Sequence, residues 1–231
     1  MSILRHIPNL ITLGNLFFGL LSIQFAYSND LYSASLCILS GAFLDFFDGF
    51  LARLLKVSGE LGKQLDSLSD LITFGVAPSV IVFQLILLSE SEFSGIAYIA
   101  FLIPLFSAYR LAKFNIDSNQ YDTFIGLPTP ANALFFISIP IAIHFNGEDA
   151  LLEFLSQKTV LIVLVIGLCL LMVSNINFIA LKFNTFNWKG NEYRFILVGM
   201  SVILLLLFHF VAIPIIILLY TVLSLINNQR K

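Results

Sequence analysis

Charged residues are scarce in this 231-residue chain, where Asp, Glu, Lys and Arg together make up only 11% of the sequence. Soluble domains carry about twice that share. Hydrophobic residues account for 58%, and they form long runs, such as 159–173 and 195–220. A run of about 20 apolar residues spans the hydrocarbon core of a bilayer as a helix. The composition therefore excludes an ordinary soluble domain and favours a bundle of membrane helices.

Cysteine and histidine are also rare. Cys37 and Cys169 both lie inside apolar runs, and His6, His144 and His209 are scattered. Neither a Cys-x-x-Cys motif nor a Cys/His cluster is present, so a zinc site or a redox motif has no support. The net charge of −2 and the lack of a basic stripe argue against a nucleic-acid partner.

The hydrophobic pattern predicts a single transmembrane domain over residues 1–231 with an all-α, polytopic helical-bundle fold. Polar residues at three- and four-residue spacing in the first span predict a face turned to the bundle interior rather than a cleaved signal. The last two spans could be one broken element, because 208–214 offers only a weak turn. The expected spans are about 8–28, 31–55, 65–88, 94–114, 129–146, 157–180, 194–209 and 211–227.

The basic residues predict the topology. If the N-terminus is cytoplasmic, all of the 12 Lys and Arg residues except Lys158 fall on the cytoplasmic side, as the positive-inside rule requires. We therefore expect a multi-pass protein of the cell (inner) membrane with both termini in the cytoplasm.

Four aspartates flank the loop between the second and third spans. Asp45 and Asp48 are three residues apart, and Asp66 and Asp70 are four apart, so each pair shares a helix face. A short loop makes the two helices antiparallel neighbours, which predicts that all four carboxylates converge near the inner membrane surface. The active site is then on the cytoplasmic side.

Converging carboxylates need positive charge to compensate them. Oxygen ligands suit Mg²⁺ or Mn²⁺, with Ca²⁺ also possible, so we expect one or two hard divalent cations per chain. A plain interhelical hydrogen-bond or salt-bridge network is the alternative, and proton relays and ion paths also use Asp. Gly49 and Gly62 could admit a nucleotide close to the backbone or could serve helix packing.

The residues of this segment resemble the signature of the CDP-alcohol phosphatidyltransferase family. Further stretches are similar to the branch of that family with serine as acceptor; one departure is Lys113, where we expect Arg. The first span (7–15), 74–78, 110–115, 124–131 and 172–174 carry this second likeness. The signature reads Asp45-x2-Asp48-Gly49-x2-Ala52-Arg53-x8-Gly62-x3-Asp66-x3-Asp70.

The resemblance implies a core of six transmembrane helices over about 1–183, two further helices over about 194–227, and homodimers. It also implies roles for individual residues. Asp45, Asp48, Asp66 and Asp70 would bind the metal, and Asp70 would also be the catalytic base. The residues expected to bind the nucleotide or its phosphates are Gly49, Ala52, Arg53, Gly62, Asn9 and Thr12.

The activity expected from this resemblance is transfer of a phosphatidyl group from CDP-diacylglycerol to L-serine with release of CMP. Arg110 and Lys113, on one helix face, are candidates for the serine carboxylate, although they could equally be topology charges. Asn115 and Pro128 complete the expected acceptor site, and the stretch 128–132 could line its cavity or simply start a helix.

Two other functions are compatible with the sequence. A sister transferase would use glycerol 3-phosphate, inositol phosphate or choline; phosphorylated acceptors should call for more basic residues, and choline for an aromatic cage. A divalent cation transporter would use the same aspartates, but it predicts them near mid-membrane rather than at the inner end.

Overall fold

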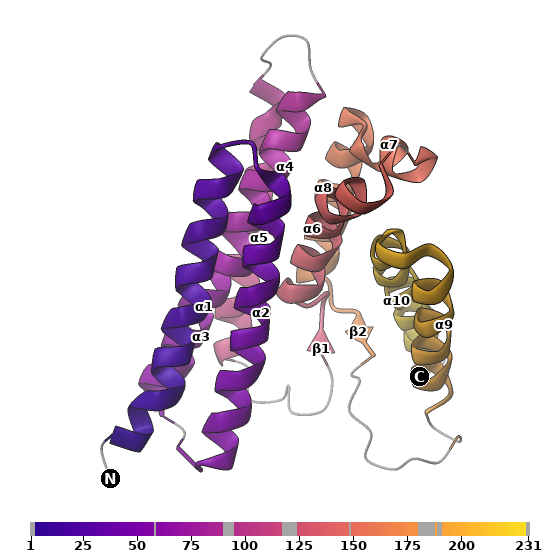
Figure 1. Ribbon diagram of the computed structural model, residues 1–231. Helices are drawn as coiled ribbons and strands as arrows, with labels where there is room; N and C mark the ends of the chain where they lie inside the picture. The colour runs from indigo at the N-terminus through magenta and orange to yellow at the C-terminus, as the bar shows by residue number, and fades with distance from the viewer. Residues whose placement is uncertain are drawn as a thin grey trace.

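Helices form almost all of the fold (Figure 1). The structure, a computed structural model, describes residues 3–57, 59–89, 95–116, 124–147, 149–179, 188 and 191–229, with the backbone alone at 3–5, 124 and 229. The elements are α1 (Ile3–Tyr27), α2 (Leu31–Leu54), α3 (Glu60–Asp70), η1 (Leu71–Val76), α4 (Ala77–Leu88), η2 (Gly95–Phe101), α5 (Leu102–Ile116), β1 (Phe124–Ile125), α6 (Thr129–Asn146), α7 (Ala150–Ser156), α8 (Lys158–Val173), β2 (Asn177–Phe178), α9 (Glu192–Phe208), η3 (His209–Val211) and α10 (Ala212–Gln229).

The first two helices form an antiparallel hairpin. Asp30 caps α2, because its side chain accepts a hydrogen bond of 3.0 Å from the backbone N–H of Ser33. This bond holds the pKa of the Asp30 carboxyl below its ordinary value. The hairpin returns the chain, so that α2 ends at the same end of the bundle at which α1 begins (Figure 1).

The third predicted span is one continuous helix of three parts, α3, η1 and α4, and it begins at Glu60. The middle part, η1, is a π-helix that starts directly after Asp70. Single π-turns inside α-helices often lie at functional sites. A Cβ added at Gly19 would lie 2.5 Å from the Thr73 hydroxyl, and one at Gly41 would lie 2.7 Å from Thr73 Cγ2. Two glycines therefore let α1 and α2 pack closely on η1.

The sixth predicted span, 157–180, is too long. Helix α8 ends at Val173, and the chain is extended at Ser174 (ψ 156°). Residues beyond it form β2, which pairs antiparallel with β1. Gly126 makes this possible, because its φ is +77° and a Cβ there would lie 2.2 Å from the Met172 carbonyl oxygen. The chain therefore leaves the helix at Ser174 and continues into the β1–β2 pair.

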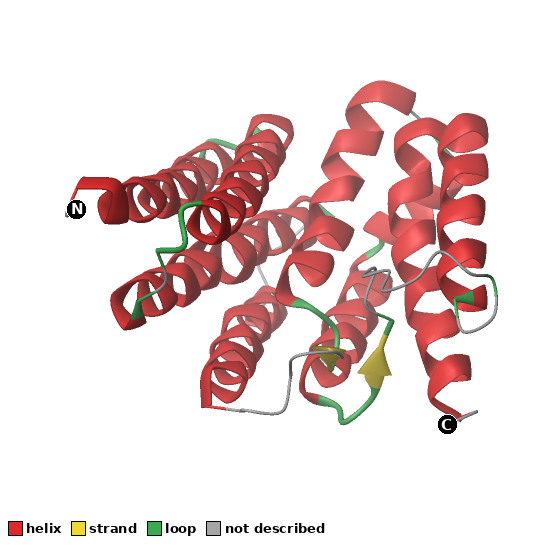
Figure 2. Ribbon diagram, turned by 90° about the horizontal axis from the view of Figure 1, so that it is seen from below, coloured by secondary structure: helices red, strands yellow, loops and turns green. Residues whose placement is uncertain are grey.

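The last two predicted spans form a hairpin, α9 and α10, that reverses at η3, where His209 has a φ of 49°. Figure 2 shows the hairpin standing to one side of α1–α5. Helix α10 packs on α6 and β2. The Ser224 hydroxyl accepts the Ile179 N–H at 3.2 Å, which ties the hairpin to the end of β2.

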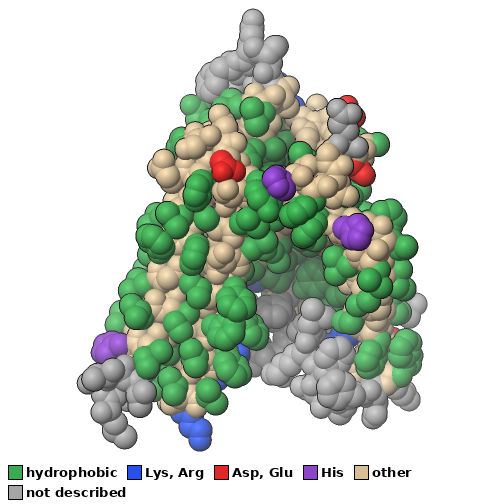
Figure 3. Space-filling view, viewed as in Figure 1, with side chains coloured by type: hydrophobic (Ala, Val, Ile, Leu, Met, Phe, Trp, Pro, Cys, Tyr) green, Lys and Arg blue, Asp and Glu red, His purple; other side chains and the backbone are tan. Residues whose placement is uncertain are grey.

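The length and apolar composition of several helices make this a multi-pass membrane protein. Within the described residues, five segments are long and apolar enough to span a bilayer, and α7 with α8, bent by 72°, could make a sixth. The five are His6–Tyr27, Leu31–Leu54, Glu60–Leu88, Gly95–Ile116 and Glu192–Asn228. Hydrophobic side chains cover much of the surface in Figure 3, as contact with lipid requires. Both chain ends lie at the same end of the molecule (Figure 1).

Candidate active site

Three carboxylates from two helices meet at one point. Helix α2 contributes Asp45 and Asp48, and helix α3 contributes Asp66; one oxygen from each lies within 4.8 Å of the other two. Asp48 is only 5% exposed, while the other two are half-buried. The antiparallel arrangement of α2 and α3 produces this convergence.

Asp70 lies next to the three clustered carboxylates. The Asp45 carboxyl interacts electrostatically with Asp70, and the Asn15 amide donates to Asp70 Oδ1 at 3.4 Å. Asp48 and Asp66 line the large cavity described below, whereas Asp70 is not among its lining residues. Asp70 therefore adjoins the three clustered carboxylates without lining the cavity.

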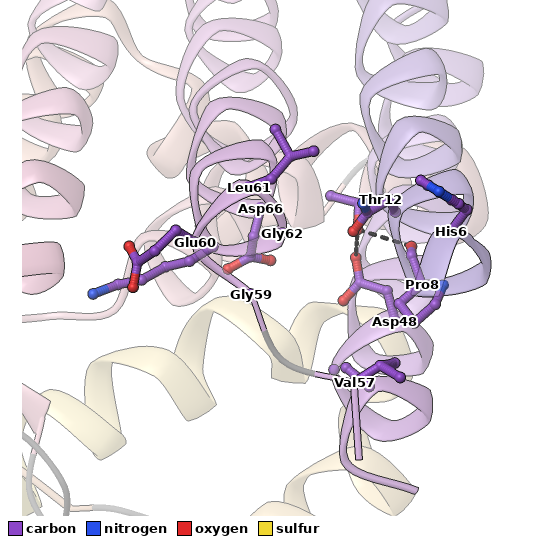
Figure 4. A pocket seen from close by; sticks show the side chains of 14 residues that line it. His6, Pro8, Thr12, Asp48, Val57, Gly59, Glu60, Leu61, Gly62 and Asp66 are labelled. Atoms are coloured by element: carbon purple, nitrogen blue, oxygen red, sulfur yellow. Dashed lines mark hydrogen bonds between the residues drawn. The ribbon is translucent and has the colours of Figure 1, made fainter. Parts of the chain in front are cut away.

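Helix α1 holds one carboxylate in place. The Thr12 hydroxyl lies 3.0 Å from the Pro8 carbonyl oxygen and also donates to Asp48 Oδ2, as Figure 4 shows. Both oxygens of the contact are buried. Thr12 therefore fixes the direction in which the Asp48 carboxylate points.

The donor set fits a hard divalent cation. Clustered carboxylate oxygens are the ligands that Mg²⁺, Mn²⁺ and Ca²⁺ prefer. Arg110 lies within electrostatic range of Asp70, but in the part of the chain that the structure describes no Lys or Arg is among the groups that act on Asp45, Asp48 or Asp66. Like charges so close and so buried are costly without a counter-ion, so a bound cation is the natural compensation.

A cavity of about 960 Å³ opens beside the cluster. Its wall comes from α1, from the end of α2 and from the start of α3, and Figure 4 shows Asp48 and Asp66 facing the space between these helices. Known ligand pockets have volumes of about 300–1,000 Å³, so the cavity is large enough for a nucleotide.

Most residues expected to bind the nucleotide line this cavity. Asn9, Thr12, Gly49, Ala52 and Gly62 all do so. A Cβ added at Gly49 would meet no atom within 4 Å, whereas one at Gly62 would lie 3.2 Å from Asn9 Oδ1. Helix packing therefore gives no reason for a glycine at position 49.

Arg53 differs from its signature neighbours. Its side chain is exposed and is not among the residues that line the cavity. It lies in the last turn of α2, where a cation also interacts favourably with the helix dipole.

The expected acceptor residues do not line the large cavity. Arg110, 8% exposed, donates from Nη1 to the Thr129 hydroxyl at 3.1 Å, and it lies within electrostatic range of Asp70. Arg110 and Lys113 line a second, much smaller pocket of about 10 Å³ next to Met172. This volume holds about one water molecule.

The remaining acceptor candidates have structural partners. Lys113 Nζ donates to Asn175 Oδ1 at 3.4 Å, and the Asn115 amide donates to the Ser67 hydroxyl at 2.8 Å. Pro128 is the N-cap residue of α6. The structure therefore does not bring these three side chains together with Arg110 into one open site.

Comparison with known proteins identifies the family. Residues 5–186 match the sequence profile of CDP-alcohol phosphatidyltransferases. The chain belongs to the CDP-alcohol phosphatidyltransferase family. Phosphotransfer is the activity of this family, and its members generally depend on a divalent cation. The matched residues contain the whole carboxylate cluster and end before the α9–α10 hairpin.

Curated members of the family resemble this phosphatidyltransferase over most of its length. The CDP-diacylglycerol–serine O-phosphatidyltransferase of Bacillus subtilis is 38% identical over 175 residues, covering 76% of this chain and 90% of the relative. The enzyme of the same name from Helicobacter pylori is 34% identical over 198 residues, covering 85% and 80%. An archaetidylserine synthase of Methanothermobacter thermautotrophicus is 31% identical over 148 residues, covering 62% and 61%.

Sequence reasoning missed several residues of the site. His6, Pro8, Glu60 and Lys63 line the cavity without having been predicted, and Asn15 contacts Asp70. Asn15 belongs to the polar face of the first span, so that face contained the signal. Glu60 and Lys63 lie close to Gly62 of the signature, whereas His6 and Pro8 lie on the first helix, and nothing in their spacing distinguishes them.

Proposed function

We propose that this chain is a phosphatidylserine synthase, which transfers the phosphatidyl group of CDP-diacylglycerol to the hydroxyl of L-serine and releases CMP. One observation carries the proposal: carboxylates of α2 and α3 lie within 4.8 Å of one another on the wall of a nucleotide-sized cavity. The names of the relatives supply the substrates.

Asp45, Asp48, Asp66 and Asp70 would hold one or two divalent cations, Mg²⁺ or Mn²⁺ being the best match to the ligands and Ca²⁺ another. A bound cation would neutralise the diphosphate and stabilise the departing CMP. The cytidine nucleotide would occupy the cavity against Asn9, Thr12, Gly49, Ala52 and Gly62, with Arg53 near its phosphates.

Asp70 would act as the catalytic base. It would accept the proton of the serine hydroxyl while that oxygen bonds to the lipid-side phosphorus, and the bond from that phosphorus to the CMP oxygen would break. Asp70 adjoins the carboxylate cluster but does not line the cavity, which supports attack from the side away from the cavity. Direct transfer inverts the phosphorus, and a trapped phosphatidyl-enzyme would contradict it.

Arg110 would bind the serine carboxylate, since a buried guanidinium close to Asp70 suits a planar anion. Lys113 would add positive charge nearby. Asn115 and Pro128 would act on the acceptor site indirectly, Asn115 by tying α5 to Ser67 of α3.

We also propose the membrane arrangement. The enzyme would lie in the cell (inner) membrane as a homodimer, with both termini and the cavity on the cytoplasmic side. A catalytic core of about 1–183 would carry the chemistry, and the hairpin of about 194–227 would be an addition to it. The distribution of Lys and Arg supports this orientation.

Release of CMP from CDP-diacylglycerol, measured with a panel of alcohols on purified protein, tests the function. We expect release with L-serine. Release with glycerol 3-phosphate, inositol phosphate or choline instead would make the chain a sister transferase. Metal flux into liposomes without any CMP release would make it a cation transporter.

A further inference from the structure

Inside the bundle, a second group of polar side chains lies where α5 meets α6. Ser107 and Arg110 belong to α5, and Asn132 belongs to α6; each side chain is more than nine-tenths buried. Within the described residues, Arg110 Nε, Ser107 Oγ and both amide atoms of Asn132 have no hydrogen-bond partner. Buried polar atoms are nearly always paired in native proteins, so this group points to a polar ligand.

The three side chains share one location. Arg110 donates to Thr129 of α6. Thr129 and Asn132 are three residues apart, as are Ser107 and Arg110, so each pair lies on one helix face. The bond between Arg110 and Thr129 therefore brings the two faces against each other.

This location adjoins the proposed catalytic base. A Cβ added at Gly75 of η1 would lie 3.3 Å from Ser107 Oγ, so Ser107 contacts the π-helix that follows Asp70. Helix α6 also packs on η1, and Arg110 lies within electrostatic range of Asp70. A ligand held here would have its reactive group next to Asp70.

We propose that Arg110 and Asn132 bind the zwitterionic head of an amino-acid acceptor, and that Asn132 is a specificity-determining residue. The inference rests on the proposed function and refines its acceptor site. A carboxylate can accept bonds from Arg110 Nε and from the Asn132 amide nitrogen. The Asn132 amide oxygen accepts a bond from the neighbouring ammonium group.

The unpaired groups match one class of acceptor. An α-amino acid has a carboxylate anion and a hydrogen-bond-donating ammonium cation attached to the same carbon. These two groups match the amide nitrogen and the amide oxygen of Asn132. Glycerol 3-phosphate and inositol phosphate have no cation, and the quaternary ammonium of choline has no N–H to donate. The site therefore selects serine by its carboxylate and ammonium groups.

Steady-state kinetics on Asn132→Ala and Asn132→Asp test the proposal, with L-serine and with 3-hydroxypropionate, which lacks the ammonium. We expect Asn132→Ala to raise the KM for serine by about 10- to 100-fold, the loss typical of a hydrogen bond to a charged group. The KM for CDP-diacylglycerol should change less than about twofold. Asn132→Asp should raise the serine KM further, because a second carboxylate repels that of serine.

Ser138→Ala is the matched control, because Ser138 is buried on the same helix but its hydroxyl donates to the Phe135 carbonyl at 2.6 Å. It should leave both KM values unchanged. The preference for serine over 3-hydroxypropionate should shrink in Asn132→Ala and persist in Ser138→Ala. An unchanged serine KM in Asn132→Ala, or an equal rise in both KM values, would overturn the proposal while leaving serine as the acceptor.

Thermal melting of the unaltered protein gives an answer without any variant. L-Serine should raise the melting temperature more than 3-hydroxypropionate or serinamide does, since each analogue lacks one charge. Equal shifts would overturn the role of the paired charges. If the unaltered protein transfers to choline or glycerol 3-phosphate rather than to serine, the proposed function fails and this proposal fails with it.

Discussion

We propose that the aspartates of the cluster have different roles in the reaction. Asp48 and Asp66 face the cavity, whereas Asp70 lies beyond Asp45 and contacts Asn15. In the proposed mechanism, Asp70 would meet an acceptor that arrives from the α5–α6 side, and Asp48 would hold a cation against the diphosphate. Substitutions at these positions should have different kinetic signatures.

Replacing Asp70 by Asn should abolish turnover and leave a folded protein. The amide keeps the shape and the contact with Asn15, but it cannot accept the serine proton. Loss of a general base lowers the rate by about 10²- to 10⁴-fold, which release of CMP measures. Asp30→Asn is the control, because Asn caps a helix about as well as Asp. Near-normal turnover of Asp70→Asn would remove Asp70 from the role of base.

Replacing Thr12 by Val should weaken metal activation. The change is nearly isosteric but removes the hydroxyl that orients Asp48. Groups that orient a metal ligand contribute about 10- to 100-fold in metal affinity, so the Mn²⁺ concentration for half-maximal activity should rise by that order. Thr221→Val is the control, since among the described residues the Thr221 hydroxyl bonds the Ile217 carbonyl of its own helix and no other group. Equal metal requirements in the two variants would contradict the orienting role.

The sequence predicts the carboxylates and the cavity residues better than the acceptor residues. Spacing along a helix determines which faces Asp45, Asp48, Asp66 and Asp70 share, and this information is local. The partners of Lys113 and Asn115 are Asn175 and Ser67, which are remote in sequence. No local pattern reveals that such side chains are already engaged.

At the scale of elements, close packing around the π-helix supports the site. Helices α1 and α2 both lie against Thr73 through Gly19 and Gly41, and the Thr73 hydroxyl donates to the Asn15 carbonyl at 3.0 Å. Because η1 directly follows Asp70, a displacement of η1 would move the proposed base. The close packing that the two glycines allow therefore helps to fix the position of Asp70.

Gly41→Ala should lower stability. The added Cβ would lie 2.7 Å from Thr73 Cγ2 and 2.8 Å from Asn15 Oδ1, and overpacking of this kind costs about 1–3 kcal/mol. In Gly199→Ala the Cβ meets no atom within 4 Å, so this control should be neutral or slightly stabilising. Melting temperatures in detergent compare the two. A Gly41→Ala protein as stable as Gly199→Ala would show that the contact is not tight.

Helix positions follow from hydrophobic runs, but helix ends depend on tertiary contacts. Runs of apolar residues predicted α6 and the α9–α10 hairpin closely. They overextended the sixth span, because pairing of β2 with β1 ends the regular helix. The π-helix after Asp70 also has no signature in composition; it packs on α1, α2 and α5.

At the scale of the whole molecule, the bundle places the cavity at the end where α1 begins and both chain ends lie (Figure 1). In the proposed mechanism, the lipid substrate would keep its tails beside the apolar surface of Figure 3 while its nucleotide enters the cavity. The family profile stops before α9, yet α10 packs on α6, the helix that carries Asn132. The hairpin therefore packs against the helix that contributes Asn132 to the proposed acceptor site.

Binding of Mn²⁺ to the purified protein in detergent, followed by electron paramagnetic resonance, tests the central claim most directly. The unaltered protein should hold about one or two ions per chain. Asp66→Asn should weaken this binding by at least about tenfold, and Asp149→Asn, outside the cluster, should not. Mn²⁺ binding that is equally tight in Asp66→Asn and in the unaltered protein would contradict a metal site shared by α2 and α3.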